Sequence, residues 1–214
     1  MNRREELAEN LATVRERIPN RDVLLIVVTK TYPVSDVQIL RELGVTDFGE
    51  NRSEEGLAKS QSVPARWHFQ GQIQSRKIKD IVQWADVVHS LDDLGHAQKM
   101  NLLATKPIDI FLQLSLDGDS NRGGVTAPHL AQLGQAIMEM ENLRLVGLMC
   151  VPPVAADPHQ SFAAVQQIHQ EFVAKFPEAR SLSAGMSGDF EIALQYGATH
   201  IRVGSSILGP RTYR

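Results

Sequence analysis

Short apolar runs that alternate with longer amphipathic segments are the feature that most limits how this chain can fold. Residues 23–28 (VLLIVV) are apolar at every position, which is typical of a strand buried on both faces of a parallel sheet. Segments with apolar residues three and four positions apart follow such runs, as expected for helices packed on a sheet. An additional helix is predicted ahead of the first strand, at residues 2–18, where Leu7, Leu11, Val14 and Ile18 share one face.

The alternation occurs eight times along the chain. The predicted strands are residues 23–28, 46–49, 66–69, 86–89, 108–114, 145–150, 181–183 and 199–203. The predicted helices between them are residues 34–43, 50–60, 75–83, 92–104, 128–141, 160–175 and 190–196. Eight parallel strand–helix units are the number that closes a barrel, so we predict an α/β fold, a (β/α)8 TIM barrel. The alternative is a doubly wound open sheet, because barrels usually need about 250 residues.

Composition restricts the classes of function. The chain has 214 residues with a formal net charge of −3 and lacks the basic surplus of nucleic-acid-binding proteins. No apolar run reaches the roughly 18 residues of a membrane span. The single cysteine, Cys150, excludes an internal disulfide, and no metal-ligand spacing is present. No linker divides residues 1–214, so we expect one domain of a cytoplasmic protein, monomeric, with no metal and no membrane or nucleic-acid partner.

One lysine stands where a barrel places its chemistry, at the carboxyl ends of the strands. Lys30 follows the first apolar run. One interpretation is an ordinary lysine whose stem is buried and whose ammonium reaches water. The other is a desolvated amine, which acts as a nucleophile and forms a Schiff base with a carbonyl.

The loops after the last two strands carry small residues, at Ser187–Gly188 and Gly204–Ser205. In barrels these loops often bind phosphate through backbone N–H groups, although glycine and serine are also common turn residues. Arg202 lies within the predicted strand at residues 199–203 and needs an acceptor, either a ligand or a neighbouring carboxylate. A Schiff-base lysine together with a phosphate site suggests pyridoxal 5′-phosphate (PLP).

Several motifs together are specific for one family. They are residues 27–30 (VVTK), 47–51 (DFGEN), 67–71 (WHFQG) with Gln74, Ser75 and Lys77, 89–92 (HSLD), 147–149 (GLM), 182–187 (LSAGMS) with Asp189, and 202–205 (RVGS) with Gly209 and Arg211. With these motifs the sequence resembles the pyridoxal phosphate homeostasis family of PLP-binding proteins (the YggS/PROSC type). It departs from the usual family pattern at residues 70–73 (QGQI), at Arg76 and at Arg52.

The resemblance implies a barrel similar to the N-terminal domain of alanine racemase, the type III fold of PLP proteins. It implies that Lys30 carries PLP as a Schiff base and that Arg202 faces the pyridine nitrogen. It places Ser187, Gly204 and Ser205 at the phosphate, and Asn51, Met149 and Ser183 along the cofactor. An arginine there disfavours protonation of the ring nitrogen, because like charges repel, and so weakens the ring as an electron sink.

These expectations favour a protein that holds or delivers PLP, without catalytic turnover, in vitamin B6 homeostasis and amino-acid and keto-acid balance. Racemisation needs two acid–base groups, and in alanine racemase an extra domain and a partner subunit supply the second; this sequence ends at Arg214 with no segment left for such a domain. PLP-dependent apo-enzymes are the expected protein partners. Three alternatives stay open: a racemase-like PLP enzyme with His68 or His89 as its base, a phosphate-binding barrel without PLP, and an interaction protein in which PLP is only structural.

Overall fold

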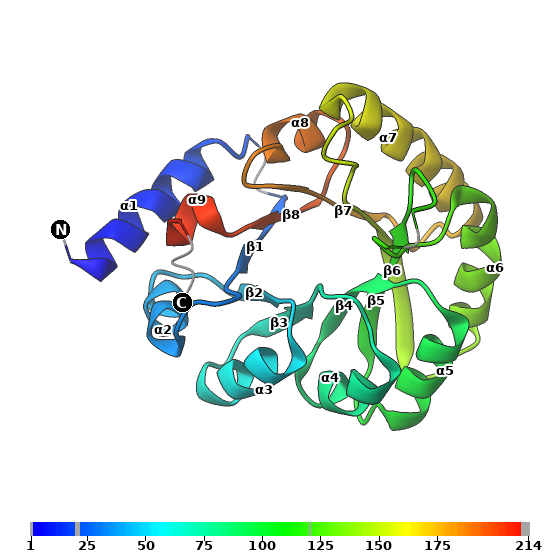
Figure 1. Cartoon of the computed structure of the whole chain (residues 1–214), viewed down its shortest axis with the longest axis horizontal. Helices are drawn as coiled ribbons and strands as arrows, with labels where there is room; N and C mark the ends of the chain where they lie inside the picture. Colours follow the sequence, from blue (N-terminus) through cyan, green and yellow to red (C-terminus); the bar gives the residue numbers. More distant parts are fainter. Residues whose placement is uncertain (1, 20–21, 120, 211–214) are drawn as a thin grey trace.

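The computed structural model describes residues 2–19, 22–119 and 121–210, and within them eight parallel strands close into a barrel (Figure 1). The strands follow one another around the barrel in chain order, and β8 pairs with β1, with Arg202 beside Ile26. They are β1 (Leu24–Val28), β2 (Asp47–Glu50), β3 (Arg66–Phe69), β4 (Val87–Leu91), β5 (Ile108–Leu114), β6 (Leu143–Cys150), β7 (Ser181–Met186) and β8 (His200–Val203). The predicted (β/α)8 barrel is therefore confirmed, and the open-sheet alternative is wrong.

Helices surround the barrel, as the amphipathic segments between the strands predict (Figure 1). They are α1 (Arg3–Glu16), α2 (Val34–Glu42), α3 (Ser53–Ser62), α4 (Ile78–Trp84), α5 (Leu94–Leu103), α6 (Ala127–Met138), α7 (Pro158–Lys175), α8 (Phe190–Gln195) and α9 (Ser205–Leu208). A 3-10 turn, Ser75–Lys77, leads into α4. Within the described ranges, none of the helices is both long enough and apolar enough to cross a membrane.

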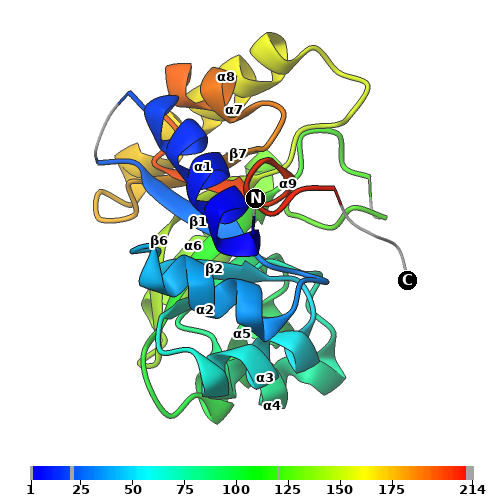
Figure 2. The same ribbon diagram turned by 90° about the vertical axis from the view of Figure 1, so that its left-hand side faces the viewer.

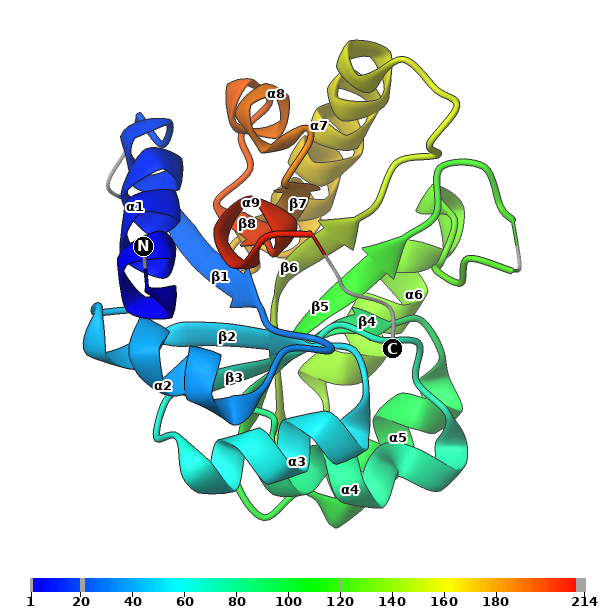
Figure 3. The same cartoon turned by 60° about the vertical axis from the view of Figure 1, so that its left-hand side comes forward.

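The extra helix α1 packs against the short helix α9 and supports the end of the barrel (Figures 2 and 3). A capping box between Asn2 and Glu5 begins α1, and the apolar stripe containing Leu7 and Leu11 is buried. Asn10 Nδ2 donates to the carbonyl of Ile207 at 3.0 Å, and a guanidinium nitrogen of Arg3 reaches the carbonyl of Leu208 at 3.0 Å. Because α9 follows β8 directly, these contacts fix the loop predicted to bind phosphate.

Several boundaries differ from the sequence-based expectation, and three of them lie at the carboxyl end of a strand, where the site is built. The helix predicted from residue 50 begins at Ser53, because Glu50 is the buried last residue of β2. Strand β4 continues to Leu91, and β7 continues to Met186 through Gly185. Most residues at these ends, such as Glu50, Ser90, Ala184 and Gly185, are small or polar and have weak strand propensity, so pairing with neighbouring strands decides their conformation.

The barrel interior combines a small apolar cluster with several buried polar groups. Val87, Phe111 and Met149 form the cluster inside the barrel. Two histidines, His68 and His89, are fully buried beside it, and the His89 ring stacks on Phe111 with centroids 4.4 Å apart. A buried polar group is costly unless it is hydrogen-bonded, so these histidines require partners inside the barrel.

Candidate functional site

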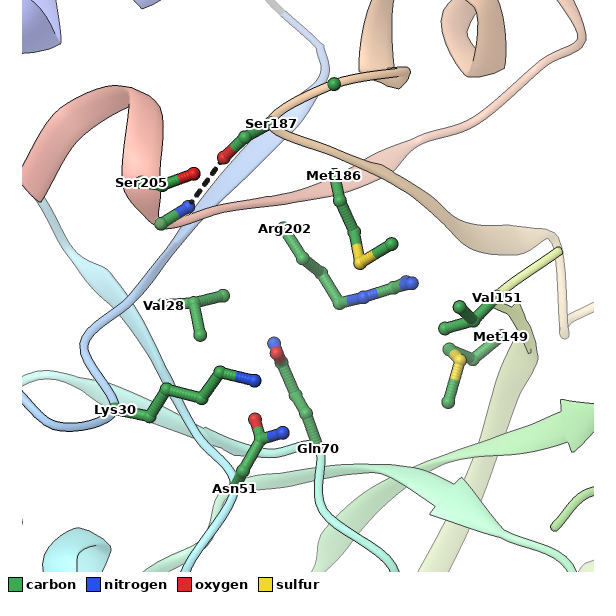
Figure 4. A pocket seen from close by; sticks show the side chains of 12 residues that line it. Val28, Lys30, Asn51, Gln70, Met149, Val151, Met186, Ser187, Arg202 and Ser205 are labelled. Carbon is green, nitrogen blue, oxygen red and sulfur yellow. Dashed lines mark hydrogen bonds between the residues drawn. The ribbon is translucent and has the colours of Figure 1, made fainter. Parts of the chain in front are cut away.

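A cavity of about 250 Å³ opens at the carboxyl ends of the strands (Figure 4). Its walls come from both sides of the β8–β1 closure and from the loops after β2, β3, β6 and β7. The lining residues are Val28, Lys30, Asn51, Gln70, Met149, Val151, Met186, Ser187, Gly188, Arg202, Gly204 and Ser205. Seven of the eight cofactor-binding residues predicted from the sequence are among them, and the eighth, Ser183, is not.

Ser183 lies one layer below the cavity, under Arg202. Its side chain is fully buried, and its hydroxyl oxygen accepts a hydrogen bond from Arg202 Nη1 at 2.6 Å. Arg202 Nη2 donates to the carbonyl of Cys150 at 3.1 Å. Burial lowers the pKa of Arg202 to about 10, so this guanidinium keeps its charge at neutral pH. Ser183 therefore supports the arginine and does not face the cavity.

Lys30 is half-buried and points across the cavity toward the amides of Asn51 and Gln70 (Figure 4). Neighbouring residues hold the backbone on both of its sides. The carbonyl of Thr29 accepts a hydrogen bond from Lys59 Nζ at 2.7 Å. The N–H of Thr31 donates to Glu55 Oε2 at 2.8 Å, and Thr31 has φ +71°, a strained value for a β-branched residue.

Lys59 also forms a buried ion pair, which the sequence analysis did not identify. Its ammonium donates to Glu50 Oε1 at 2.6 Å, and Thr29 Oγ1 donates to the same oxygen at 2.6 Å. The signal present in the sequence is the spacing of nine residues between Glu50, at the end of a strand, and Lys59, on the following helix. Such a pair is meaningful only when the helix turns back over the strand, which the sequence does not show.

The wall formed by the last two loops is built from small residues. Ser187 Oγ accepts a hydrogen bond from the backbone N–H of Gly204 at 3.2 Å (Figure 4). It accepts another from the N–H of Ser206 at 3.4 Å. A Cβ on Gly204 would lie 3.1 Å from the carbonyl oxygen of Val28, tighter than most real contacts. Glycine therefore lets the two backbones approach, and the small side chains leave room for an anion beside the Ser187 hydroxyl.

Gln70 contributes a polar atom that lacks a partner among the described residues. Its Nε2 is buried without a hydrogen bond, and Figure 4 shows the amide directed into the cavity between Lys30 and Arg202. The side chain passes over Gly49, where an added Cβ would lie 2.6 Å from that nitrogen. A buried donor without an acceptor costs about 1–3 kcal/mol. This orphaned donor fits a cavity built to receive a ligand with acceptor atoms.

The histidines of the racemase alternative do not reach the cavity. His68 and His89 are both fully buried, and neither lines it. Burial lowers the pKa of each, that of His89 strongly. Their position disfavours a catalytic base at either residue. Of the other residues singled out in the sequence, Gly209 ends α9, and Arg211 lies outside the described residues.

The residues present fit PLP. The group needs an amine for its aldehyde, donors for its phosphate and a polar partner for its ring nitrogen. The cavity supplies them in Lys30, in the Ser187–Gly204–Ser205 wall and in Arg202 on the side opposite Lys30 (Figure 4). The orphaned amide of Gln70 adds a donor between the two ends. A closed parallel barrel with this cavity defines a class of barrel suited to binding a phosphorylated cofactor through a lysine.

Comparison with known proteins identifies the family. The model for the alanine racemase N-terminal domain matches residues 3–212. The "Pyridoxal phosphate homeostasis protein" of Corynebacterium glutamicum is 40% identical over 204 residues, covering 90% of this chain and 92% of the relative. The protein of that name from Mycobacterium leprae is 35% identical over 245 residues, covering 99% and 95%. This chain belongs to the alanine racemase N-terminal domain family and, within it, to the pyridoxal phosphate homeostasis proteins.

Solved structures agree with this assignment. PipY from Synechococcus elongatus, solved with PLP bound, superposes with a TM-score of 0.87 at 30% identity, covering 95% of this chain and 100% of PipY. Alanine racemase from C. glutamicum superposes with a TM-score of 0.77 at 12% identity, covering 95% of this chain and 60% of the racemase. The second likeness shows the fold alone.

Proposed function

We propose that this protein binds PLP covalently through Lys30 and acts in PLP homeostasis as a carrier or reservoir, without catalytic turnover. The observation that carries the proposal is one cavity that combines a half-buried lysine with a wall of small serine and glycine residues. When bound, PLP supplies an aldehyde that condenses with primary amines and a ring that absorbs visible light.

Each part of the cavity has a defined task. The Lys59–Glu50 pair and Glu55 hold the backbone around Lys30, so the amine enters the cavity from a fixed position. The hydroxyl of Ser187 and the backbone of Gly204 and Ser205 receive the phosphate. Arg202, held from below by Ser183, presents its positive charge to the ring nitrogen. A positive charge there opposes protonation of the ring, which limits carbanion chemistry.

The acid–base content of the cavity favours a carrier over a racemase. Among the described lining residues, the ionisable side chains are Lys30 and Arg202. Racemisation needs a proton donor and a proton acceptor on opposite faces of the substrate carbon. Arg202 is a poor base, since it stays charged until about pH 10. Lys30 alone cannot serve both faces.

Visible absorbance tests the cofactor assignment. Wild-type protein incubated with PLP should show an absorption band that borohydride treatment removes. The residue modified by borohydride should be Lys30, by peptide mass. Lys30→Ala should lack the band, while Lys79→Ala, a change at an exposed lysine on α4, should keep it. Absence of a band in the wild type would leave a phosphate-binding barrel with another ligand.

Turnover assays test the carrier assignment. With the PLP-loaded protein and a panel of amino acids, racemisation and transamination should not exceed the rate of free PLP. A steady-state rate above that background would replace the carrier by an enzyme. We further propose a single cytoplasmic domain over residues 1–214 that acts as a monomer and passes PLP to apo-enzymes. Analytical ultracentrifugation tests whether the protein is a monomer. Activation of a PLP-free enzyme by the loaded protein tests whether PLP is transferred.

A further inference from the structure

A continuous chain of hydrogen bonds runs through the barrel interior and ends at the cavity. Asp47 Oδ1 lies 2.9 Å from His68 Nε2, and His68 Nδ1 lies 2.9 Å from His89 Nε2. His89 Nδ1 lies 2.9 Å from Ser183 Oγ, which accepts from Arg202 Nη1 at 2.6 Å. These five residues come from five strands, β2, β3, β4, β7 and β8. The chain connects a carboxylate at the start of β2 with the guanidinium in the cavity wall.

The chemistry of its two ends gives the chain a direction. A carboxylate only accepts hydrogen bonds, and a guanidinium only donates them. Burial works to raise the pKa of Asp47, but hydrogen bonds from His68 and Thr46 outweigh it and hold that pKa below its ordinary value. Asp47 is therefore ionised at neutral pH, and His68 Nε2 carries the proton that it donates to Asp47.

The remaining protons follow from neutral histidines. Burial lowers the pKa of His68 and, strongly, that of His89, so each ring carries one proton at neutral pH. With Nε2 of His68 protonated, its Nδ1 accepts from His89 Nε2–H. His89 Nδ1 then accepts from the Ser183 hydroxyl, whose oxygen accepts from Arg202. Every donor points toward Asp47, and no bond in the chain is left with two donors or two acceptors.

We propose that Asp47, His68, His89 and Ser183 are positioning residues that fix the orientation of the Arg202 guanidinium in the cofactor cavity. Below the cavity, Arg202 is bonded to Ser183 and to the Cys150 carbonyl. The carbonyl is fixed by the sheet. A hydroxyl group can rotate, so its lone pairs have a fixed direction only when its proton is donated in a hydrogen bond. His89 accepts the hydrogen bond from the Ser183 hydroxyl, and Asp47 determines the tautomers of both histidines.

Nuclear magnetic resonance of the ligand-free protein tests the chain without relying on PLP. His68 and His89 should both be neutral and protonated at Nε2. The two NH2 groups of Arg202 should give separate signals, because the guanidinium rotates slowly. Ser183→Ala should average those signals, and Ser183→Thr, which restores a hydroxyl, should separate them again. His169 on α7 takes no part in this series of hydrogen bonds, so its signals should not change in either variant.

PLP binding tests the consequence for the cavity, and this part rests on the proposed function. Ser183→Ala should bind PLP about tenfold more weakly, the effect of one lost hydrogen bond of about 1.4 kcal/mol. Its visible band should also shift, because the charge beside the ring is no longer fixed. Ser183→Thr should restore both, and Ser161→Ala, which removes another buried hydroxyl on α7, should behave as wild type.

The outcomes separate the two proposals. Protonation of His68 or His89 at Nδ1 in the ligand-free protein would contradict the proposed series of hydrogen bonds. Unchanged Arg202 signals in a folded Ser183→Ala variant would contradict it as well. Wild-type spectrum and affinity in that variant would overturn the positioning role. If the wild-type protein binds no PLP while the histidine and arginine resonances behave as expected, the series of hydrogen bonds is confirmed and the cofactor assignment is wrong. Circular dichroism of each variant checks folding.

Discussion

Lys59 Nζ lies 2.6 Å from Glu50 Oε1 and 2.7 Å from the carbonyl oxygen of Thr29, which ties a buried ion pair to the residue before Lys30. Both charged side chains are almost completely removed from water. The second carboxylate oxygen, Glu50 Oε2, is buried without a hydrogen bond among the described residues. The ion pair therefore loses its hydration, and Lys59 holds the backbone directly before Lys30.

Breaking this ion pair is expected to be costly because it leaves a charge buried alone. Lys59→Met should lower the free energy of unfolding by about 3–5 kcal/mol. The double variant Glu50→Gln with Lys59→Met should lose less, since no unpaired charge remains. Urea denaturation of the three proteins measures both values. An equal loss in the single and the double variant would contradict the prediction.

The same variant should respond to pH in a definite direction. Burial raises the pKa of Glu50, and the charge of Lys59 opposes that rise. Without Lys59 the pKa rises further, so acid neutralises the buried carboxylate in the folded protein. The deficit of Lys59→Met relative to wild type should shrink as the pH falls from 8 to 5. A deficit independent of pH would show that lost packing, and not charge, causes it.

Gln70 should show a trade of stability against ligand affinity. Gln70→Leu removes the orphaned Nε2 donor and should raise the stability of the ligand-free protein by up to about 1 kcal/mol. It should also weaken PLP binding, because the ligand loses a donor in the cavity. Thermal unfolding without ligand and equilibrium titration with PLP measure the two effects. A variant that loses stability and keeps full affinity would show that Gln70 serves packing only.

The serine–glycine wall should recognise phosphate by itself. Ser187→Ala removes the acceptor for the N–H groups of Gly204 and Ser206, and with it the hydroxyl that we propose contacts the phosphate. Affinity for PLP should fall about tenfold, while affinity for pyridoxal, which lacks the phosphate, should stay the same. Inorganic phosphate should compete with PLP in the wild type and less well in the variant. Equal losses for PLP and pyridoxal would place Ser187 elsewhere in recognition.

Buried histidines should make the protein sensitive to mild acid. Burial lowers the pKa values of His68 and His89, and it lowers that of His200 to about 4. The unfolded chain protonates its histidines near pH 6.5, before the folded protein does, so this stability is complete above pH 6.5 and is lost as the pH falls. Each histidine contributes a slope of about 1.4 kcal/mol per pH unit.

Urea denaturation between pH 7.5 and pH 5 checks this slope. His200→Gln should reduce the slope of the free energy of unfolding against pH by the contribution of one histidine. Stability that stays constant over this range would mean that the folded and unfolded proteins take up the same number of protons, so that burial does not lower the pKa values of these rings.

The sequence by itself determined the alternation of eight strands and helices, which favours a barrel over an open sheet. Apolar runs such as residues 23–28 specify buried parallel strands, and the three-and-four spacing on α1 specifies a helix that buries one face. The sequence also indicated Lys30, Arg202 and the small residues of the last two loops as cavity residues, because parallel strands in a barrel deliver their carboxyl ends to one face, and the family resemblance added Asn51 and Met149. Local pattern is sufficient for properties of this kind.

Only the tertiary structure decided which polar residues become partners. The sequence predicts Ser183 as a cavity residue, but its buried hydroxyl instead bonds Arg202 and His89, in a hydrogen-bond series with His68 and Asp47. The pairing of Lys59 with Glu50 and the orphaned amide of Gln70 likewise depend on how neighbouring elements meet. Hydrogen bonds between distant residues depend on atomic distances within a closed barrel, and a pattern of residue types carries no such distances.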